Sequence, residues 1–576
     1  MKFTRLKWQV SHIHFVLLAI VGTVAAFAVP VWNFSQTIPR DWDYFNALSW
    51  IVSSNVWHYQ RFPLHDPWMC GGLDILANPQ SRVFSLFGVL DLIFPPHLAN
   101  LFSLMIYTVL GFLGGKWFFE RLKFDRFAAS VVAALYVLCS WFSTHFAEGH
   151  ITYGSILLLP LAGVLLLNID RLPFLWCAAF FFAHTLLDGG IYTVIFTMLF
   201  LLSLLLTVSE ARRALVVSLR GFPFHWILLG VSAFLLSSGK WIPVLWYHSS
   251  RLPALHTEVM ELRALGYSFF YPRQILSVGT GTPLIFGFHE YACYLGVPLV
   301  TAMGVAVFSS FRKVWPFLLA AVFWFWTASG WGDPVNPWQV FLKIPLVNNA
   351  HVQSRVFIIM FIFILILAAQ GLRAMKTPLL GLIMLIEFFA VHNLAFQRQF
   401  SKSSVDAEFL TRPIASDSLL GTIPYGVKPT HYLNRNMGSR QCYEPAAPAT
   451  SVRDVKDPLY MGEAYATSGT VNIVEYTPAK IVLKYLLTSP GALSINTNSL
   501  DGWTVYNGGG RVVSAPHEVL RVEPAGLNGF IELRYVPGYL KYLIWSFPLG
   551  VICFILLLSD VLRPWGNRRK YGQSKI

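Results

Sequence analysis

Long apolar stretches separated by polar connections recur along almost the whole chain. An α-helix needs about 20 mostly apolar residues to cross the hydrocarbon core of a bilayer. Runs that meet or approach this length lie at roughly residues 12–33, 98–118, 127–142, 152–168, 173–187, 191–208, 224–247, 291–310, 314–329, 355–371, 377–396 and 540–559. The pattern predicts a polytopic α-helical membrane protein with about twelve transmembrane helices.

The basic residues indicate on which side of the membrane each connection between the runs lies. Lys and Arg gather before the first run, in short connections such as 116–126 and 210–220, and in the tail at 563–570. Such clusters are typical of cytoplasmic segments, so both termini are expected in the cytoplasm. The first run has no small-residue cleavage site near its end, which favours a retained helix over a signal peptide.

Two connections expected on the opposite side of the membrane are long, at 34–97 and 248–290. The first is rich in Pro, Gly and aromatic residues, so we expect it to be ordered but irregular. Residues 397–539 are polar, and segments 480–485 and 530–535 alternate like strands. We therefore expect a membrane domain over 1–396, a small β-rich extracytoplasmic domain over 397–539, and a last helix with a basic cytoplasmic tail over 540–576.

Composition agrees with this organisation. The 576 residues are 55% hydrophobic and 12% charged, whereas a soluble domain carries about 25% charged residues. The net charge of +14 lies mostly in the short connections, which indicates membrane topology rather than a nucleic-acid partner. No phosphate-binding glycine loop and no dinucleotide-binding glycine motif occurs, which excludes an ATP-driven transporter within this chain. The six cysteines form no C-x-x-C pair, although Cys70 and Cys442 are both expected outside and could pair.

Two carboxylates, Asp41 and Asp43, open the first long outer connection. A carboxylate in such a place is a candidate general base. In a helix, residues two apart point roughly 200° apart, so only one of the two could face a cavity. The alternative is that both cap a short interfacial helix.

Several segments, in this order, resemble the GT-C glycosyltransferases and, within them, the YfhO-like bacterial membrane proteins. Residues 41–45 (DWDYF) lie where GT-C enzymes keep acidic residues. Residues 62–72 (FPLHDPWMCGG) and 77–81 (ANPQS) resemble a YfhO-like stretch in which Trp-Asn is usual where His65-Asp66 stands here. Further matching segments lie at 289–296, 353–355, 500–503, 522–526 and 535–538. The resemblance covers nearly the whole chain.

The resemblance implies a GT-C-like membrane domain in the bacterial cytoplasmic membrane, with its active site on the outer face. Such an enzyme moves a sugar, with inversion, from a polyprenyl-phosphate carrier to a cell-envelope glycan, polymer or lipid. The spacing of Asp41 to Phe45 is similar to that in protein O-mannosyltransferases, which favours Asp41 over Asp43 as the base.

A leaving phosphate requires positive charge near the outer membrane face. The basic residues at helix ends on that side are Lys240, Arg251, Arg273 and Arg355. Lys240 lies within an apolar run, where a charge is costly and often functional, although it could also extend to the interface. Arg355 could likewise be a simple interfacial anchor.

A compact polar set follows the third apolar run. Substrate positioning is expected from His145, Glu148, His150, Asp188 and Glu290. The first four could instead bind a divalent metal such as Mg²⁺ or Mn²⁺, or simply form a hydrogen-bonded loop, since the histidine spacing matches no zinc pattern. Neither the sugar nor the metal requirement follows from the sequence.

Two other functions remain open. A lipid-linked glycan transporter or flippase would be expected to show repeated halves with charges inside the membrane in both, and no clear duplication is present. A non-catalytic envelope assembly protein, with the β-rich domain binding polymer, would not need the acidic residues of the first loop.

Overall fold

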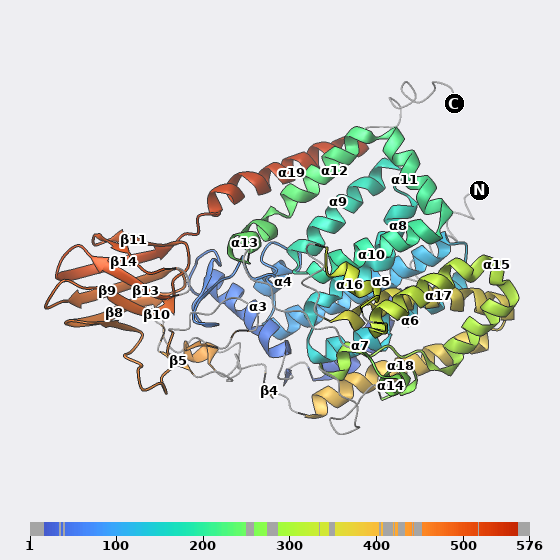
Figure 1. Ribbon diagram of the computed structural model, residues 1–576, viewed down its shortest axis with the longest axis horizontal. Helices are drawn as coiled ribbons and strands as arrows, with labels where there is room; N and C mark the ends of the chain where they lie inside the picture. Colours follow the sequence, from blue (N-terminus) through green and yellow to red (C-terminus); the bar gives the residue numbers. More distant parts are fainter. Residues whose placement is uncertain are drawn as a thin grey trace.

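The computed structural model describes residues 17–33, 36–37, 41–248, 259–273, 286–332, 334–344, 352–402, 405–406, 419, 421–423, 432–440, 442, 452–515 and 518–562. A bundle of helices occupies one end of the molecule and a β-sandwich the other, with the first long connection between them (Figure 1). Arg251 and part of the second long connection lie outside the described residues.

The helices follow the predicted apolar runs closely. In chain order they are α2 (Ala28–Trp32), α3 (Asp41–Trp57), α4 (Gly88–Ile93), α5 (Pro96–Arg121), α6 (Arg126–Val137), α7 (Ser140–Glu148), the 3₁₀ helix η1 (Ile151–Leu158), α8 (Leu159–Leu167), α9 (Leu172–Leu187), α10 (Ile191–Thr207), α11 (Ser209–Gly221), α12 (Pro223–Leu236), α13 (Ser238–His248), α14 (Leu262–Phe270), η2 (Phe288–Glu290), α15 (Gly296–Ser329), α16 (Pro337–Phe341), η4 (Gln353–Val356), α17 (Phe357–Met375), α18 (Pro378–Lys402) and α19 (Leu540–Leu562).

Fewer of these helices than predicted are long enough to cross a membrane. Among the described residues, five helices have the length and apolar composition of a span, and up to seven do if each of two bent pairs counts as one. Four further apolar helices are shorter, at Leu17–Ala26, Ile151–Leu167, Leu172–Leu187 and Leu540–Ile555. The predicted total of about twelve spans is therefore not confirmed, because several apolar runs form short helices.

Helix α17 forms the centre of the bundle. Its residues 357–369 are all buried, and a helix that is apolar on every side belongs inside a protein or a membrane. Helix α15 folds back beside it at Ser310, whose backbone is not helical. Phe269 contacts residues at both ends of α15. Its carbonyl oxygen accepts a hydrogen bond from Leu295 N (2.9 Å), and its ring packs on that of Phe325, with 6.0 Å between the ring centroids. In a straight helix Leu295 and Phe325 would be about 45 Å apart.

The C-terminal polar segment contains two four-stranded antiparallel sheets packed face to face (Figure 1). One sheet has the order β12 (Gly510–Val512), β13 (Val519–Pro524), β10 (Leu493–Asn498) and β7 (Ala464–Ala466). The other has the order β11 (Trp503–Asn507), β14 (Asn528–Tyr535), β9 (Lys480–Leu486) and β8 (Thr470–Thr477). Strands β9 and β14 contain the two predicted alternating segments, whose inward residues Leu483, Ile531 and Leu533 are fully buried.

The first long connection is more regular than expected. It opens with α3, a helix of 17 residues of which most are buried. Two short strands follow, β2 (His65–Asp66) paired with β3 (Leu73–Asp74). The expectation of irregular structure fails at α3 because burial on several sides, rather than an amphipathic pattern, stabilises this helix.

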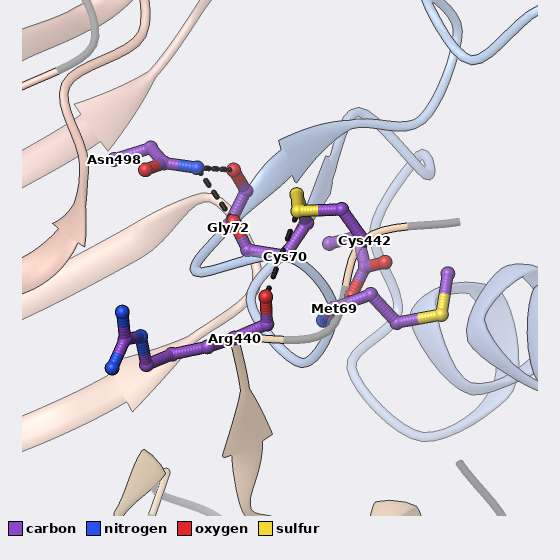
Figure 2. The surroundings of a disulfide bond; sticks show 7 residues. Met69, Cys70, Gly72, Arg440, Cys442 and Asn498 are labelled. Carbon is purple, nitrogen blue, oxygen red and sulfur yellow. Dashed lines mark hydrogen bonds between the residues drawn. A yellow bond between two sulfur atoms is a disulfide. The ribbon is translucent and has the colours of Figure 1, made fainter. Parts of the chain in front are cut away.

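A disulfide joins the first connection to the segment before the sandwich. Cys70 and Cys442 are bonded, with their Cα atoms 4.5 Å apart. Asn498 of β10 donates to the carbonyl oxygens of both Cys70 and Gly72, each at 2.7 Å (Figure 2). The pairing that the sequence left open is therefore present, and together with the Asn498 hydrogen bonds it attaches the first long connection to the C-terminal polar segment.

Candidate active site

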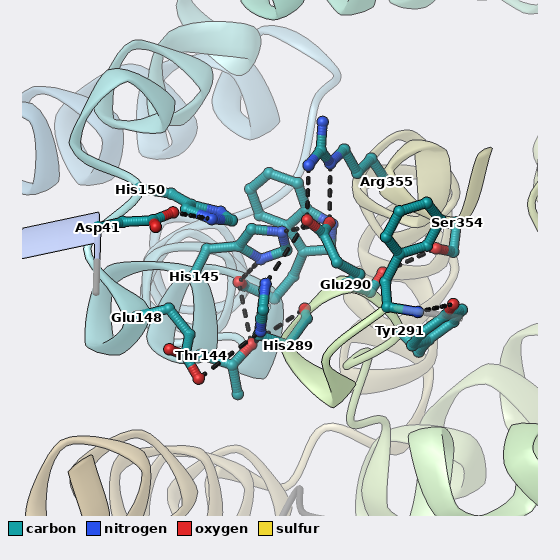
Figure 3. A network of polar contacts seen from close by, with 12 residues as sticks. Asp41, Thr144, His145, Glu148, His150, His289, Glu290, Tyr291, Ser354 and Arg355 are labelled. Atoms are coloured by element: carbon teal, nitrogen blue, oxygen red, sulfur yellow. Dashed lines mark hydrogen bonds and ion pairs between the residues drawn. The ribbon is translucent and has the colours of Figure 1, made fainter. Parts of the chain in front are cut away.

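Polar side chains from five parts of the chain meet at one end of the helical bundle (Figure 3). They come from the start of α3, from α7 and the residues just after it, from the η2 and η4 segments and from the end of α18. The residues are Asp41, His145, Glu148, His150, His289, Glu290, Arg355 and Gln399. We call this group the helix-end cluster.

Asp41 contacts His150 directly. The Oδ2 atom of Asp41 lies 2.7 Å from Nε2 of His150. Gly149, just before His150, ends α7 with a φ of 108°, and a side chain there would collide with the backbone of Trp42. Trp42 Nε1 also donates to Phe146 O at 2.8 Å. The close approach of α7 and α3 therefore fixes the distance between the carboxylate and the imidazole.

Glu290 and Arg355 form a bidentate ion pair in the cluster. Arg355 Nε is 2.7 Å from Glu290 Oε2, and Nη2 is 2.5 Å from Oε1. The guanidinium also lies over the rings of Tyr192 (4.8 Å) and Tyr153 (5.3 Å). Its Nη1 atom has no hydrogen-bond partner among the residues that the structure describes, and Figure 3 shows it pointing away from Glu290. Arg355 is therefore held rigidly with one donor group still available.

The pKa of Glu290 reflects this arrangement. Burial alone would raise the pKa of the carboxyl group. The positive charge of Arg355 and hydrogen bonds from Arg355, His145 and His289 outweigh that effect, and they hold the pKa well below its usual range. Glu290 is thus an anion at neutral pH and serves as a fixed acceptor rather than as a proton donor.

His145 lies between two acceptors. Its Nδ1 is 2.7 Å from Trp141 O and its Nε2 is 3.2 Å from Glu290 Oε2. The neutral ring can donate to one of these oxygens, whereas the imidazolium can donate to both. The ring also stacks on Trp141 at 4.1 Å, so its orientation is fixed. The sequence placed His145 in a loop after a helix, but it lies within α7.

His289 and Gln399 are the members of the cluster that were not among the site residues predicted from the sequence. The Nδ1 of His289 is 3.6 Å from Glu148 Oε1, and its Nε2 is 3.5 Å from Glu290 Oε1. Gln399 of α18 donates to the same Glu148 oxygen. The adjacent His289-Glu290 pair at the end of the second long connection is the signal that could have identified His289.

Three of these residues could hold a metal ion. One ligand atom each from His145, His150 and Glu290 lie within 4.8 Å of one another. Two imidazoles and a carboxylate suit a transition metal better than Mg²⁺. Each oxygen of Glu290 also accepts a hydrogen bond from Arg355, so a metal ion would share the carboxylate with the guanidinium.

The remaining predicted residues lie elsewhere. Asp43 is 1% exposed and, two residues after Asp41 in α3, lies on another side of that helix. The pKa of Tyr432 is raised first by burial and then by the charges of Asp66 and Asp43. Lys240 is buried and donates to the carbonyl oxygens of Asn78 (3.1 Å) and Ser81.

The last two predicted residues are Asp188 and Arg273. Asp188 accepts a hydrogen bond from Tyr107 OH at 2.6 Å and lines a pocket beside Arg82. Arg273 is exposed after α14. The structure therefore brings together Asp41, His145, Glu148, His150, Glu290 and Arg355. Lys240 and Asp188 make their contacts elsewhere, and Asp43 lies on another side of α3 from Asp41.

Comparison with known proteins found likenesses among solved structures. No family model and no curated protein matches the sequence. The solved structure of the arabinofuranosyltransferase AftD from Mycobacteria aligns with a TM-score of 0.42 and 15% sequence identity, over 91% of this chain. This chain spans only 40% of the length of that protein. The resemblance to GT-C and YfhO-like proteins that the motifs suggest remains a prediction.

Proposed function

We propose that this protein is a membrane glycosyltransferase that moves a sugar, with inversion, from a polyprenyl-phosphate carrier to a cell-envelope glycan, polymer or lipid. The observation that carries the proposal is the helix-end cluster. It places a carboxylate–imidazole pair, Asp41 and His150, in one group with the buried cation Arg355. Base and cation together are what glycosyl transfer from a phosphate donor requires.

Asp41 is the base in this proposal. The acceptor hydroxyl attacks the anomeric carbon, forming the new glycosidic bond while the bond from that carbon to the phosphate oxygen breaks. The hydroxyl proton passes to Asp41, whose orientation is set by the 2.7 Å contact with His150. Attack on the face opposite the leaving phosphate inverts the anomeric centre.

Arg355 receives the leaving phosphate. Its Nη1 group is the donor that Glu290 does not use, and the bidentate pair keeps it in place before the substrate arrives. Arg273 is exposed and could meet a lipid phosphate at the surface. Lys240 instead holds the first long connection through two of its carbonyl oxygens, so its role becomes one of positioning.

Two features support an active site on the outer face of the bacterial cytoplasmic membrane. The Cys70–Cys442 disulfide links the first long connection to the C-terminal polar segment, and disulfides persist in oxidising compartments. The cluster also lies at the same end of the bundle as that connection, since Asp41 belongs to both. The carrier and the acceptor would then approach from the membrane and from the envelope.

The proposal is tested with purified protein in nanodiscs. Release of polyprenyl phosphate is measured from a panel of polyprenyl-phosphate sugars, with envelope extract as the acceptor. Asp41→Asn should lower turnover by about 10²–10⁴-fold, whereas Asp43→Asn should keep turnover wherever it keeps the wild-type melting temperature. Equal turnover of the wild type and Asp41→Asn would show that Asp41 is not the base. No turnover on any donor would remove the enzyme proposal itself.

A further inference from the structure

Three imidazole rings meet in the helix-end cluster, and the proposed transfer gives only His150 a task. The ring centroids of His145, His150 and His289 lie 5.0–5.6 Å from one another. One ligand atom each of His145, His150 and Glu290 lies within 4.8 Å of the other two. Imidazole and carboxylate groups gathered in this way are typical ligands of a transition-metal ion.

The hydrogen bonds of His145 leave a metal-binding nitrogen next to Glu290. Its Nδ1 is 2.7 Å from the carbonyl oxygen of Trp141. A carbonyl oxygen only accepts, so this short contact indicates that Nδ1 carries the proton and that Nε2 of the neutral ring carries a lone pair. That lone pair faces Glu290 Oε2 at 3.2 Å. Two electron-rich atoms that face each other at this distance require a cation between them.

The separation of these two atoms fits a shared metal ion. Tetrahedral Zn²⁺ binds imidazole nitrogen and carboxylate oxygen at about 2.0–2.2 Å, which places neighbouring ligand atoms about 3.3 Å apart. The 3.2 Å between His145 Nε2 and Glu290 Oε2 matches that spacing. Glu290 Oε2 accepts one hydrogen bond from Arg355 Nε, and a carboxylate oxygen has two lone pairs, so a metal ion and the guanidinium can share it.

His150 has the contacts of a metal-binding histidine that an outer carboxylate holds in place. The residue is 9% exposed, and its Nε2 is 2.7 Å from Asp41 Oδ2. Its Nδ1 is buried and has no hydrogen-bond partner among the residues that the structure describes. Metal-binding histidines almost always donate their other N–H to a carboxylate or to a backbone carbonyl. His150 has such a partner in Asp41, and His145 has one in Trp141.

The charge of the cluster favours a divalent cation over a single proton. The cluster contains three carboxyl groups and one guanidinium. With the carboxyl groups ionised and the imidazoles neutral, it carries two net negative charges. A proton on His145 would offset half of this charge and would leave Nδ1 of His150 without a partner. A divalent ion would offset all of it and could bind both imidazoles.

We propose that His145, His150 and Glu290 bind one Zn²⁺ ion, with the fourth coordination position open to water or to a substrate oxygen. Three protein ligands and one open position are the arrangement of catalytic rather than structural zinc. Ligand separations of up to 4.8 Å have to shorten by as much as about 1.5 Å around the ion, so the side chains close on it. This inference goes beyond the proposed transfer and does not depend on it.

The test measures metal binding and needs no turnover. The full-length protein is purified in detergent without a histidine tag, freed of metal with a chelator and titrated with Zn²⁺ by calorimetry. The wild type should bind one ion per chain, and excess Mg²⁺ should not compete. Asp41→Asn, which removes only the outer carboxylate, should weaken binding by about 10–100-fold. His150→Gln removes a ligand and should weaken binding further.

X-ray absorption of the zinc-loaded protein identifies the ligands. The wild type should show nitrogen and oxygen ligands at about 2.0–2.2 Å, with the scattering pattern of two imidazoles. His58→Gln, at an exposed histidine just after α3, is the matched control for His150→Gln and should bind like the wild type. If His150→Gln lowers the melting temperature, the wild-type spectrum and the affinity of Asp41→Asn provide the readout.

Two results would overturn the metal proposal. One is a wild type without a saturable Zn²⁺ site. The other is a site whose spectrum lacks two imidazoles, or that His150→Gln and Asp41→Asn bind as tightly as His58→Gln, since the ion would then be held elsewhere. Failure of the transferase proposal gives a different result, in which carrier release is absent while one Zn²⁺ still binds and depends on His150.

Discussion

At the scale of single residues, the Glu290–Arg355 pair should contribute strongly to both stability and turnover. The side chains are 5% and 7% exposed, so removing one partner leaves a buried charge uncompensated. Such a loss costs about 3–5 kcal/mol. Arg355→Lys keeps the positive charge but cannot make the bidentate contact with Glu290. We expect the Arg355→Lys variant to melt at a lower temperature than the wild type and to release carrier at least tenfold more slowly.

The control for this prediction is the double variant Glu290→Gln/Arg355→Gln, which removes both charges. It should be more stable than Arg355→Gln alone, because no single buried charge remains. Melting temperature and carrier release are measured for both single variants and the double variant. Additive losses of stability would contradict the importance of the pair.

At the scale of elements, the contact between α7 and α3 should set the activity of the base. Gly149 allows this contact, since a side chain there would overlap the backbone between Asp41 and Trp42. Gly149→Ala should therefore separate α3 from His150 and reduce carrier release about as much as Asp41→Asn. Its φ of 108° adds strain for any L-residue.

A matched glycine provides the comparison. Gly230 lies in α12, and nothing lies within 4 Å of a Cβ built there. Gly230→Ala should leave turnover unchanged and should stabilise the helix by about 0.5–1 kcal/mol. If Gly149→Ala keeps the turnover of Gly230→Ala, then the spacing of the two helices does not control the base.

The same scale shows how far the sequence determines the fold. The eleventh and twelfth predicted helices, 377–396 and 540–559, correspond to α18 and α19. Long apolar runs with polar ends strongly favour a helix over other structures, so these two could be predicted. The predicted break between 310 and 314 corresponds to the non-helical Ser310. Helix α3 was missed because its apolar and polar positions follow no clear period.

The candidate site could be predicted from the sequence only in part. Acidic and basic residues next to apolar runs could be identified one at a time, as Asp41, His150 and Glu290 were. Which of these residues contact one another could not be predicted, because contacts such as His145–Glu290 join residues 145 positions apart. Lys240 shows that a charge inside an apolar run is an ambiguous signal, since such a side chain can also bind backbone carbonyl oxygens.

At the scale of the whole molecule, the first long connection lies between the membrane bundle and the sandwich and is held by both. The Cys70–Cys442 bond closes a separation of 372 residues. The double variant Cys70→Ser/Cys442→Ser should lose about 2–5 kcal/mol of stability and become sensitive to trypsin in this connection. Cys177→Ser, at an exposed free cysteine, is the control and should resemble the wild type in both measurements.

Asp74 lies in the first long connection and contacts both the sandwich and the start of α19. We expect it to make the association of these three parts depend on pH. Tyr535 and Tyr539, which flank the end of the sandwich and the start of α19, donate to its carboxyl group at 2.7–2.8 Å. Burial raises the pKa of Asp74 to about 6, although these hydrogen bonds oppose the rise. The folded protein therefore holds a proton here at pH values where the unfolded chain, with a pKa near 3.8, has released it.

The sign of the effect follows from this difference. The stabilisation from protonated Asp74 is complete below about pH 4 and is lost as the pH rises through about 6. The difference in melting temperature between the wild type and Asp74→Asn should therefore fall across this window, whereas contributions from other groups cancel. Asp501→Asn, which removes an exposed carboxylate at the same junction, is the control. A difference that stays constant from pH 4 to 8 would show that Asp74 does not couple protonation to the docking of the sandwich.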